Sequence, residues 1–146
     1  MDYEKLLNEK EILMNVWGKE CIVAMDDDIE LPQIFILEKL NWVEEHKDDI
    51  IQFALDAEDF LDGINEFIAK EIARKGSCEL YDGTILKEVI DEERLKESIL
   101  INSIYFSEND FGIDLATAEP GYFGGHLLAI SVSYDSNEME YEGMNG

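Results

Sequence analysis

The pattern of apolar and polar positions divides the chain into three parts. Residues 12 to 25 are dense in apolar and β-branched side chains around Gly18, which predicts two short strands. Apolar residues then recur at steps of three and four as far as Ser98, which predicts helices. After Ser98 apolar and polar residues alternate, as is typical of strands with one buried face and one wet face.

Two helices are predicted in the first half of the middle part. One covers residues 32 to 46 and starts at Pro32, a residue that suits a first helical turn. Its apolar stripe consists of Ile34, Leu37, Leu40 and Val43. The other covers residues 50 to 72 and has the clearest helical period of the chain. We expect it to be the central helix that covers the sheet, with Phe60 and Phe67 buried.

The ends of these helices carry recognisable signals. Asp48 or Asp49 is a suitable N-cap for the long helix, and Gly76 follows its basic last turn as a helix-ending glycine. A third, highly charged helix is predicted over residues 84 to 98, with Thr84 as its cap.

Four strands are predicted after the helices, over residues 99–106, 111–116, 127–134 and 138–143. The segments "SEND" and "DSNE" have the composition of tight turns between consecutive antiparallel strands. The predicted fold is therefore α+β: N-terminal short strands, two to three helices, and a C-terminal antiparallel strand meander, with the helices packed on one face of the sheet. We expect residues 1–146 to form a single domain.

The charge of the chain is far from balanced. Thirty-five Asp and Glu face eleven Lys and Arg, which gives a formal net charge of −24. A field of this sign repels nucleic acids and anionic membranes and attracts basic proteins. Two acidic trios are expected to be exposed and dispensable for folding. They are Asp56, Asp59 and Asp62 on the long helix, and Asp91, Glu92 and Glu93 on the charged helix. The alternative is that the acidity serves solubility alone.

The segment "EPGYFGGH", residues 119 to 126, is the most unusual stretch of the chain. Tyr122 and Phe123 are expected to pack on the core, and Gly124-Gly125 suits a bend that enters the next strand. We interpret His126 as a structural turn residue, because no nucleophile elbow and no HExxH motif accompanies it. The alternative is a pocket beside His126 with Tyr122, Asp114 and Glu119 as polar neighbours.

No cofactor or metal site is predicted. Cys21 and Cys78 lie far apart without a CxxC motif, so we expect idle thiols rather than a zinc site. The segment that starts at Asp135 resembles the first half of a calcium loop but lacks its later ligand and its glycine. A nucleotide-binding motif is absent. With no signal-peptide pattern and no apolar run long enough for a membrane span, a cytoplasmic protein is expected.

The C-terminal third resembles a family of small uncharacterised bacterial proteins, a domain of unknown function. The resemblance is carried by the "I-x-F" at residues 104 to 106, "F-G-G-H" at 123 to 126, the alternating strand at 129 to 134, and Gly143. Ser136-Asn137 replaces the usual "D-G" of the last hairpin. The resemblance implies an α+β fold with no established activity. Some such small acidic proteins are encoded beside bacterial toxins, which implies a role as immunity proteins.

Two functions follow as hypotheses. The first is a non-enzymatic module that binds a basic protein partner, such as a nuclease toxin that it neutralises. The second is a small enzyme or ligand-binding protein with its pocket beside His126. The oligomeric state is left open.

Overall fold

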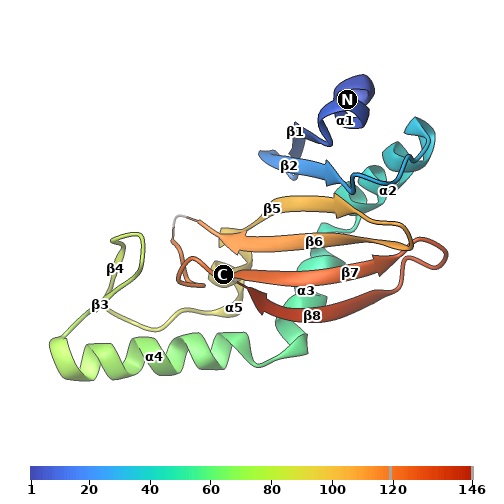
Figure 1. Cartoon of the computed structure of the whole chain (residues 1–146). Helices are drawn as coiled ribbons and strands as arrows, with labels where there is room; N and C mark the ends of the chain where they lie inside the picture. Colours follow the sequence, from blue (N-terminus) through green and yellow to red (C-terminus); the bar gives the residue numbers. More distant parts are fainter. Residues whose placement is uncertain (119, 146) are drawn as a thin grey trace.

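The computed structural model describes residues 1 to 118 and 120 to 145 and is built around a six-stranded sheet (Figure 1). The sheet has the order β1-β2-β5-β6-β7-β8, and every neighbouring pair is antiparallel except β2 and β5, which run parallel. Its strands are β1 (Glu11–Val16), β2 (Lys19–Met25), β5 (Ile99–Phe106), β6 (Asp110–Thr117), β7 (Leu127–Ser133) and β8 (Met139–Asn145). The predicted N-terminal strand pair, C-terminal meander and α+β class are confirmed.

The chain between β2 and β5 forms most of the helices and a small hairpin. The helices are α1 (Tyr3–Glu9), α2 (Gln33–Glu45), α3 (Lys47–Ala57), α4 (Phe60–Lys75) and α5 (Glu92–Ser98), and the hairpin pairs β3 (Cys78–Glu79) with β4 (Ile85–Leu86). Because this long connection returns the chain to the sheet edge of β2 in the same direction, β5 lies parallel to β2.

One face of the sheet is covered and the other is open. On β6, Phe111, Ile113 and Leu115 are fully buried, while Gly112 and Asp114 between them point to the other face. Figure 1 shows α2 and α3 behind the strands and no helix in front of them. The predicted placement of the helices on one face of the sheet is therefore confirmed.

The predicted long helix over residues 50 to 72 is wrong, because it is two helices. The chain leaves the helical conformation at Glu58, whose backbone is extended between α3 and α4. Several acidic residues lie at this break. Their negative charge is unfavourable at the C-terminal end of α3, because a helix carries a partial negative charge there. The same charges favour the positive N-terminal end of α4, where Asp59 occupies the N-cap position.

The ends of these two helices also differ from the prediction in part. Asp48 and Asp49 lie in the first turn of α3, and His46 precedes them at the N-cap position. The predicted end of α4 is confirmed, since Gly76 has a φ of 86° and its N–H donates to the carbonyl of Ile72.

The helix predicted over residues 32 to 46 is confirmed as α2, but its predicted inward stripe is wrong at Ile34, which is 78% exposed. Leu40 and Val43 of the predicted stripe are buried, and the inward face also carries Ile36 and Lys39. Lys39 is only 5% exposed, and its Nζ donates to the carbonyl of Tyr134 (2.6 Å) and to Asn137 Oδ1 (2.9 Å). These charge-assisted bonds hold α2 against the β7–β8 turn and fix its rotation.

Two short helices complete the comparison. The helix predicted over residues 84 to 98 begins only at Glu92, because Asp91 caps it by accepting from the N–H of Arg94 (2.8 Å). Ile85 belongs to the hairpin instead. Helix α1 was not predicted; it has seven residues and one fully buried side chain, Leu6, so it is too short to show a helical period.

Phe60 and Phe67 now have different expected roles in stability. Phe60 is 8% exposed and contacts the rings of Phe123 and Tyr141, whereas Phe67 is 50% exposed. We expect Phe60→Ala to lower the free energy of unfolding by about 3–5 kcal/mol and Phe67→Ala by less than about 1 kcal/mol, measured by urea denaturation. Equal losses in the two variants would contradict this packing.

Candidate functional site

Acidic residues from three helices converge on one side of the molecule. Asp56 at the end of α3, Asp59 and Asp62 at the start of α4, and Glu92 of α5 line one shallow hollow of about 170 Å³. Glu92 of the second trio therefore adjoins the first trio in space, although about 30 residues separate them along the chain. We name this surface the acidic helix face; it comprises Asp56, Asp59, Asp62, Asp91, Glu92 and Glu93.

A glutamine joins the two halves of the acidic helix face. The side-chain amide of Gln52 on α3 donates to Asp56 Oδ1 (2.9 Å) and to Glu92 Oε1 (3.2 Å). Lys96 donates to Gln52 Oε1 and forms an ion pair with Glu92 (3.3 Å). Asp56, Asp59 and Asp62 form no ion pair with any described Lys or Arg. Their charge is therefore left for solvent or for a partner.

The predicted dispensability of the acidic trios needs one correction. Asp91 has a structural role, because its side chain caps α5. Asn caps a helix about as well as Asp, whereas Ala does not. The charge of Asp91 can therefore be removed without loss of the cap only by substitution with Asn.

The segment around His126 forms a tight turn. Gly124 and Gly125 have φ values of 63° and 86°, and the N–H of His126 donates to the carbonyl of Phe123 (3.1 Å). Tyr122 and Phe123 are buried, as predicted from the sequence. The bend expected at Gly124-Gly125 is also present, since both glycines lie in the left-handed region that other residues rarely adopt.

Two polar side chains hold this turn in place. Asp82 accepts a hydrogen bond from the N–H of Gly121 (2.8 Å), and Thr117 Oγ1 accepts one from the N–H of Phe123 (2.9 Å). The hydrogen bond from the N–H of Thr84, with a further one from Gly121, keeps the pKa of Asp82 below its usual value. Asp82 therefore stays ionised at neutral pH, so the turn keeps its anchor to the β3–β4 hairpin.

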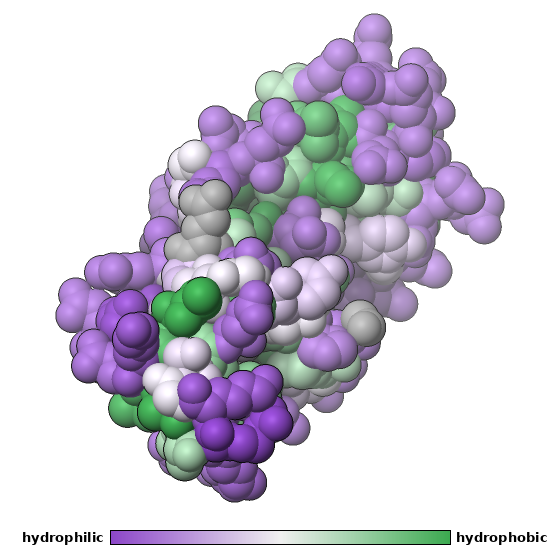
Figure 2. Space-filling view, turned by 90° about the vertical axis from the view of Figure 1, so that its left-hand side faces the viewer, coloured by the Kyte–Doolittle hydropathy of each residue, from purple (hydrophilic) through white to green (hydrophobic). Residues whose placement is uncertain are grey.

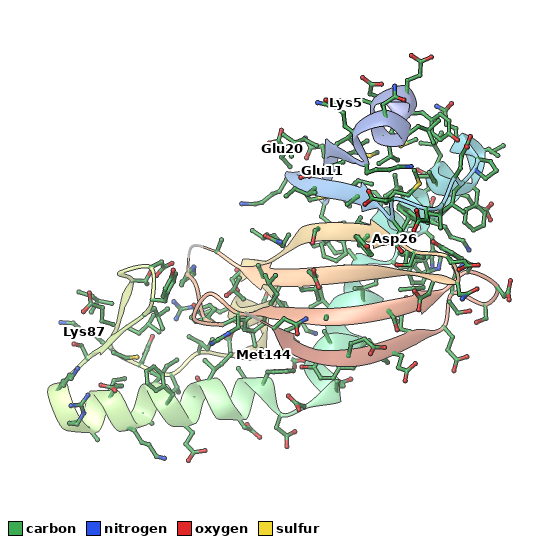
Figure 3. All side chains as sticks on the ribbon, in the orientation of Figure 1. Lys5, Glu11, Glu20, Asp26, Lys87 and Met144 are labelled. Carbon is green, nitrogen blue, oxygen red and sulfur yellow. The ribbon has the colours of Figure 1, made fainter. Side chains whose placement is uncertain are left out.

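A groove of about 550 Å³ lies between α4 and this turn. Its apolar lining includes Phe60, Ile64 and Phe67 from α4, Phe123 from the turn, and Met144 from the end of β8. Figure 3 places Met144 between β8 and α4, which agrees with this arrangement. We name this cavity the α4 groove; Glu58, Asp59, Tyr122 and His126 also line it.

Of the predicted polar neighbours of His126, the structure places Tyr122 beside it and Asp114 elsewhere. Tyr122 and His126 line the same groove. The prediction that Asp114 lies beside them is wrong: Asp114 is on the open face of the sheet, where it accepts from Ser103 Oγ (3.1 Å). Strand alternation explains this, because the neighbours Ile113 and Leu115 take the buried face. Glu119 lies outside the described residues.

Sequence reasoning anticipated a pocket beside His126 and Tyr122 but missed the part of its lining that comes from α4 and β8. Phe67 was assigned to the core, and Met144 was not considered, yet these side chains are 50% and 43% exposed. The available signal was the breadth of the apolar stripe in residues 50 to 72, which is wider than one sheet contact needs.

The thiols are not poised for nucleophilic chemistry. Burial, and to a smaller extent Glu44, raises the pKa of Cys21 to about 11, and burial also raises the pKa of Cys78. Both thiols are buried and protonated at neutral pH. Within residues 1–118 and 120–145, no group of three or more His, Cys, Asp and Glu could hold a metal ion.

No family model, curated protein or solved structure matches this chain. The resemblance of the C-terminal third to an uncharacterised bacterial family therefore stays a prediction. Among the helices that the structure describes, none has the length and apolar composition needed to cross a membrane.

In the turn at His126, we expect stability to depend on the backbone conformation of the glycines and not on the side chain of His126. The ring of His126 is exposed and forms no hydrogen bond with the described part of the chain, so His126→Gln should change the free energy of unfolding by less than about 0.5 kcal/mol. Gly125→Ala should cost about 1–2 kcal/mol, because it forces an alanine into the left-handed conformation (φ 86°). Thermal or urea unfolding checks both, and a larger loss for His126→Gln would assign the side chain a structural role.

Proposed function

We propose that this protein is a non-enzymatic module that binds a basic protein through its acidic helix face. The observation that carries the proposal is the convergence of carboxylates from α3, α4 and α5 around one hollow. Three of them, Asp56, Asp59 and Asp62, have no described basic partner within the chain. Carboxylates that remain uncompensated at one place create the local field that a cation-rich surface recognises.

The distribution of charge over the rest of the chain supports the same proposal. Residues 99 to 146, which include the four strands of the meander, contain no Lys and no Arg. This part of the chain therefore adds only negative charge to the field of the chain, whose net charge is −24. Such a field accelerates the encounter with a basic partner and repels acidic competitors.

The partner class that fits is a cationic protein whose own function involves phosphate groups. A nuclease-like toxin is one such protein, since its substrate-binding surface must be basic. Clustered carboxylates compete for that surface because they present the same sign of charge. We therefore propose a cytoplasmic immunity protein that neutralises a basic toxin.

A ligand-binding role for the α4 groove is the second candidate. Its volume of about 550 Å³ lies in the range of small-molecule sites, and its lining is mainly apolar. An enzymatic role has less support, because the ring of His126 contacts no hydrogen-bonding partner in the described residues and both thiols are protonated.

The acidic helix face yields a kinetic prediction. The triple variant Asp56→Asn, Asp59→Asn, Asp62→Asn should slow association with a basic partner, and the effect should shrink as salt screens the charges. Its melting temperature should hardly change, because reduced self-repulsion offsets the lost attraction to the N-terminus of α4. The partner is first captured on the immobilised protein and purified. Stopped-flow measurements at low and high salt then give its association rate with the unchanged chain and with the triple variant.

A matched control separates this face from net charge in general. Glu11→Gln and Glu20→Gln, which Figure 3 places away from α4, and Asp27→Asn just after β2 remove the same charge from exposed positions. This control should reduce the association rate much less than the triple variant of the acidic helix face. Equal slowing by both variants, or association that is indifferent to salt, would show that no binding site exists at the acidic helix face.

A further inference from the structure

The α4 groove is a mainly apolar hollow of about 550 Å³ that the fold does not explain. Phe67 points half of its surface to solvent although it lies on the same side of α4 as the buried Phe60. Leaving an aromatic ring half exposed forgoes part of its transfer free energy. Figure 2, which faces the end of the molecule with β3 and β4, shows other small apolar patches between polar surfaces.

Gly63 is a second unexplained feature of this groove. It lies inside α4, where glycine weakens a helix relative to alanine. Neither backbone conformation nor packing within the chain requires it, since a Cβ added there would meet no atom within 4 Å. Gly63 lies between Phe60 and Phe67 in the groove lining. Because it has no side chain, another chain can come close to the backbone of α4 at this point.

The groove is continuous with the acidic helix face. Asp59 and Phe60 line both hollows, and Glu58 lies beside them in the groove. No Lys or Arg is among the groove residues. An occupant that fits must therefore combine an apolar face with positive charges beside it.

These features argue for a segment of another protein. A second copy of this chain also has a net charge of −24 and would be repelled, as would an anionic membrane. Phe60, Ile64 and Phe67 form a ridge at steps of four and three along α4, and such a ridge packs against another helix. Recognition of an amphipathic helix by an apolar groove is a common mode of peptide binding.

We propose that the α4 groove binds an amphipathic helix of a basic partner protein. Apolar side chains of this helix cover Ile64 and Phe67, its backbone approaches α4 at Gly63, and its Lys or Arg residues lie against Glu58 and Asp59. The inference rests on the proposed function in expecting a basic protein partner, and it adds the shape and chemistry of the segment that the partner inserts.

The test uses fluorescent peptides with the whole chain. The probe is a peptide of α4's own length, 16 residues, with Leu at helical spacing on one face and Lys on the other. A scrambled peptide of the same composition has the same charge but no apolar face. Fluorescence anisotropy should show the amphipathic peptide binding about tenfold more tightly than the scrambled one, as expected for burial of one or two large apolar side chains.

Two variants locate the binding. Phe67→Ser should remove most of this tenfold preference, while Ile34→Ser, which changes an exposed apolar residue on α2, should leave it unchanged. Gly63→Ala should raise the melting temperature, because alanine favours the helix, and yet weaken binding of the amphipathic peptide. This opposite movement of stability and affinity distinguishes a contact at Gly63 from general damage to the fold.

The outcomes separate the inference from the function on which it rests. If the Asp56, Asp59 and Asp62 variant weakens both peptides but Phe67→Ser and Gly63→Ala change nothing, the groove inference is overturned and the acidic helix face stands. If Phe67→Ser removes the preference but the acidic variant has no effect, the groove binds a helix and the charge-based function fails. Equal binding of the two peptides, or a dimer of the chain that Phe67→Ser abolishes, would also overturn the inference.

Discussion

A sheet whose strands alternate apolar and polar residues can bury only one face, and this constraint determines how the helices are used. The buried face of β5 to β8 carries large side chains such as Phe106, Phe111 and Ile130, and helices pack over them. Helix α4 begins beside this core at Phe60 and then runs outward below β8 (Figure 1). Phe60 and Ile68 of α4 are therefore buried by the rest of the chain, whereas Phe67 stays half exposed.

The charge of the chain is compatible with this fold because almost all of it stays on the outside. Among the Lys and Arg residues that the structure describes, Lys39 is the exception, since it is buried and hydrogen-bonded to the β7–β8 turn. The carboxylates of the acidic helix face lie at or near helix ends, where α3 stops and where α4 and α5 start. Helix starts attract negative charge, so the arrangement that supports α4 and α5 also concentrates the acidic helix face.

The sequence predicted best those elements whose local pattern and final environment agree. The strands of the meander were predicted closely, because alternation depends only on which face is buried. The break at Glu58 was missed because α3 and α4 both bury apolar residues, so their period continues across it. The exposure of Ile34 and Phe67 could not be predicted, because it depends on how Lys39 orients α2 and on how far α4 extends past the sheet.

The same limits apply to the candidate site. The acidic trios were found in the sequence, but the approach of Glu92 to the first trio depends on the turn between α3 and α4 and on the position of α5. The pocket beside His126 was anticipated with Tyr122, whereas Asp114 was placed wrongly because a residue close in sequence lies on the opposite face of a strand. The groove lining from α4 was missed, since only the tertiary structure brings Phe67 and Met144 beside the turn.

The central claim is that a basic partner docks along α4 and the adjoining acidic helix face rather than on the open face of the sheet. Amide chemical-shift mapping of the isotope-labelled chain with the amphipathic basic peptide tests it most directly. The account predicts the largest shift changes at residues 56 to 67 and 121 to 126, with small changes on the open face at Gly112, Ala129 and Ser131. Largest changes on that open face, with α4 unaffected, would contradict it.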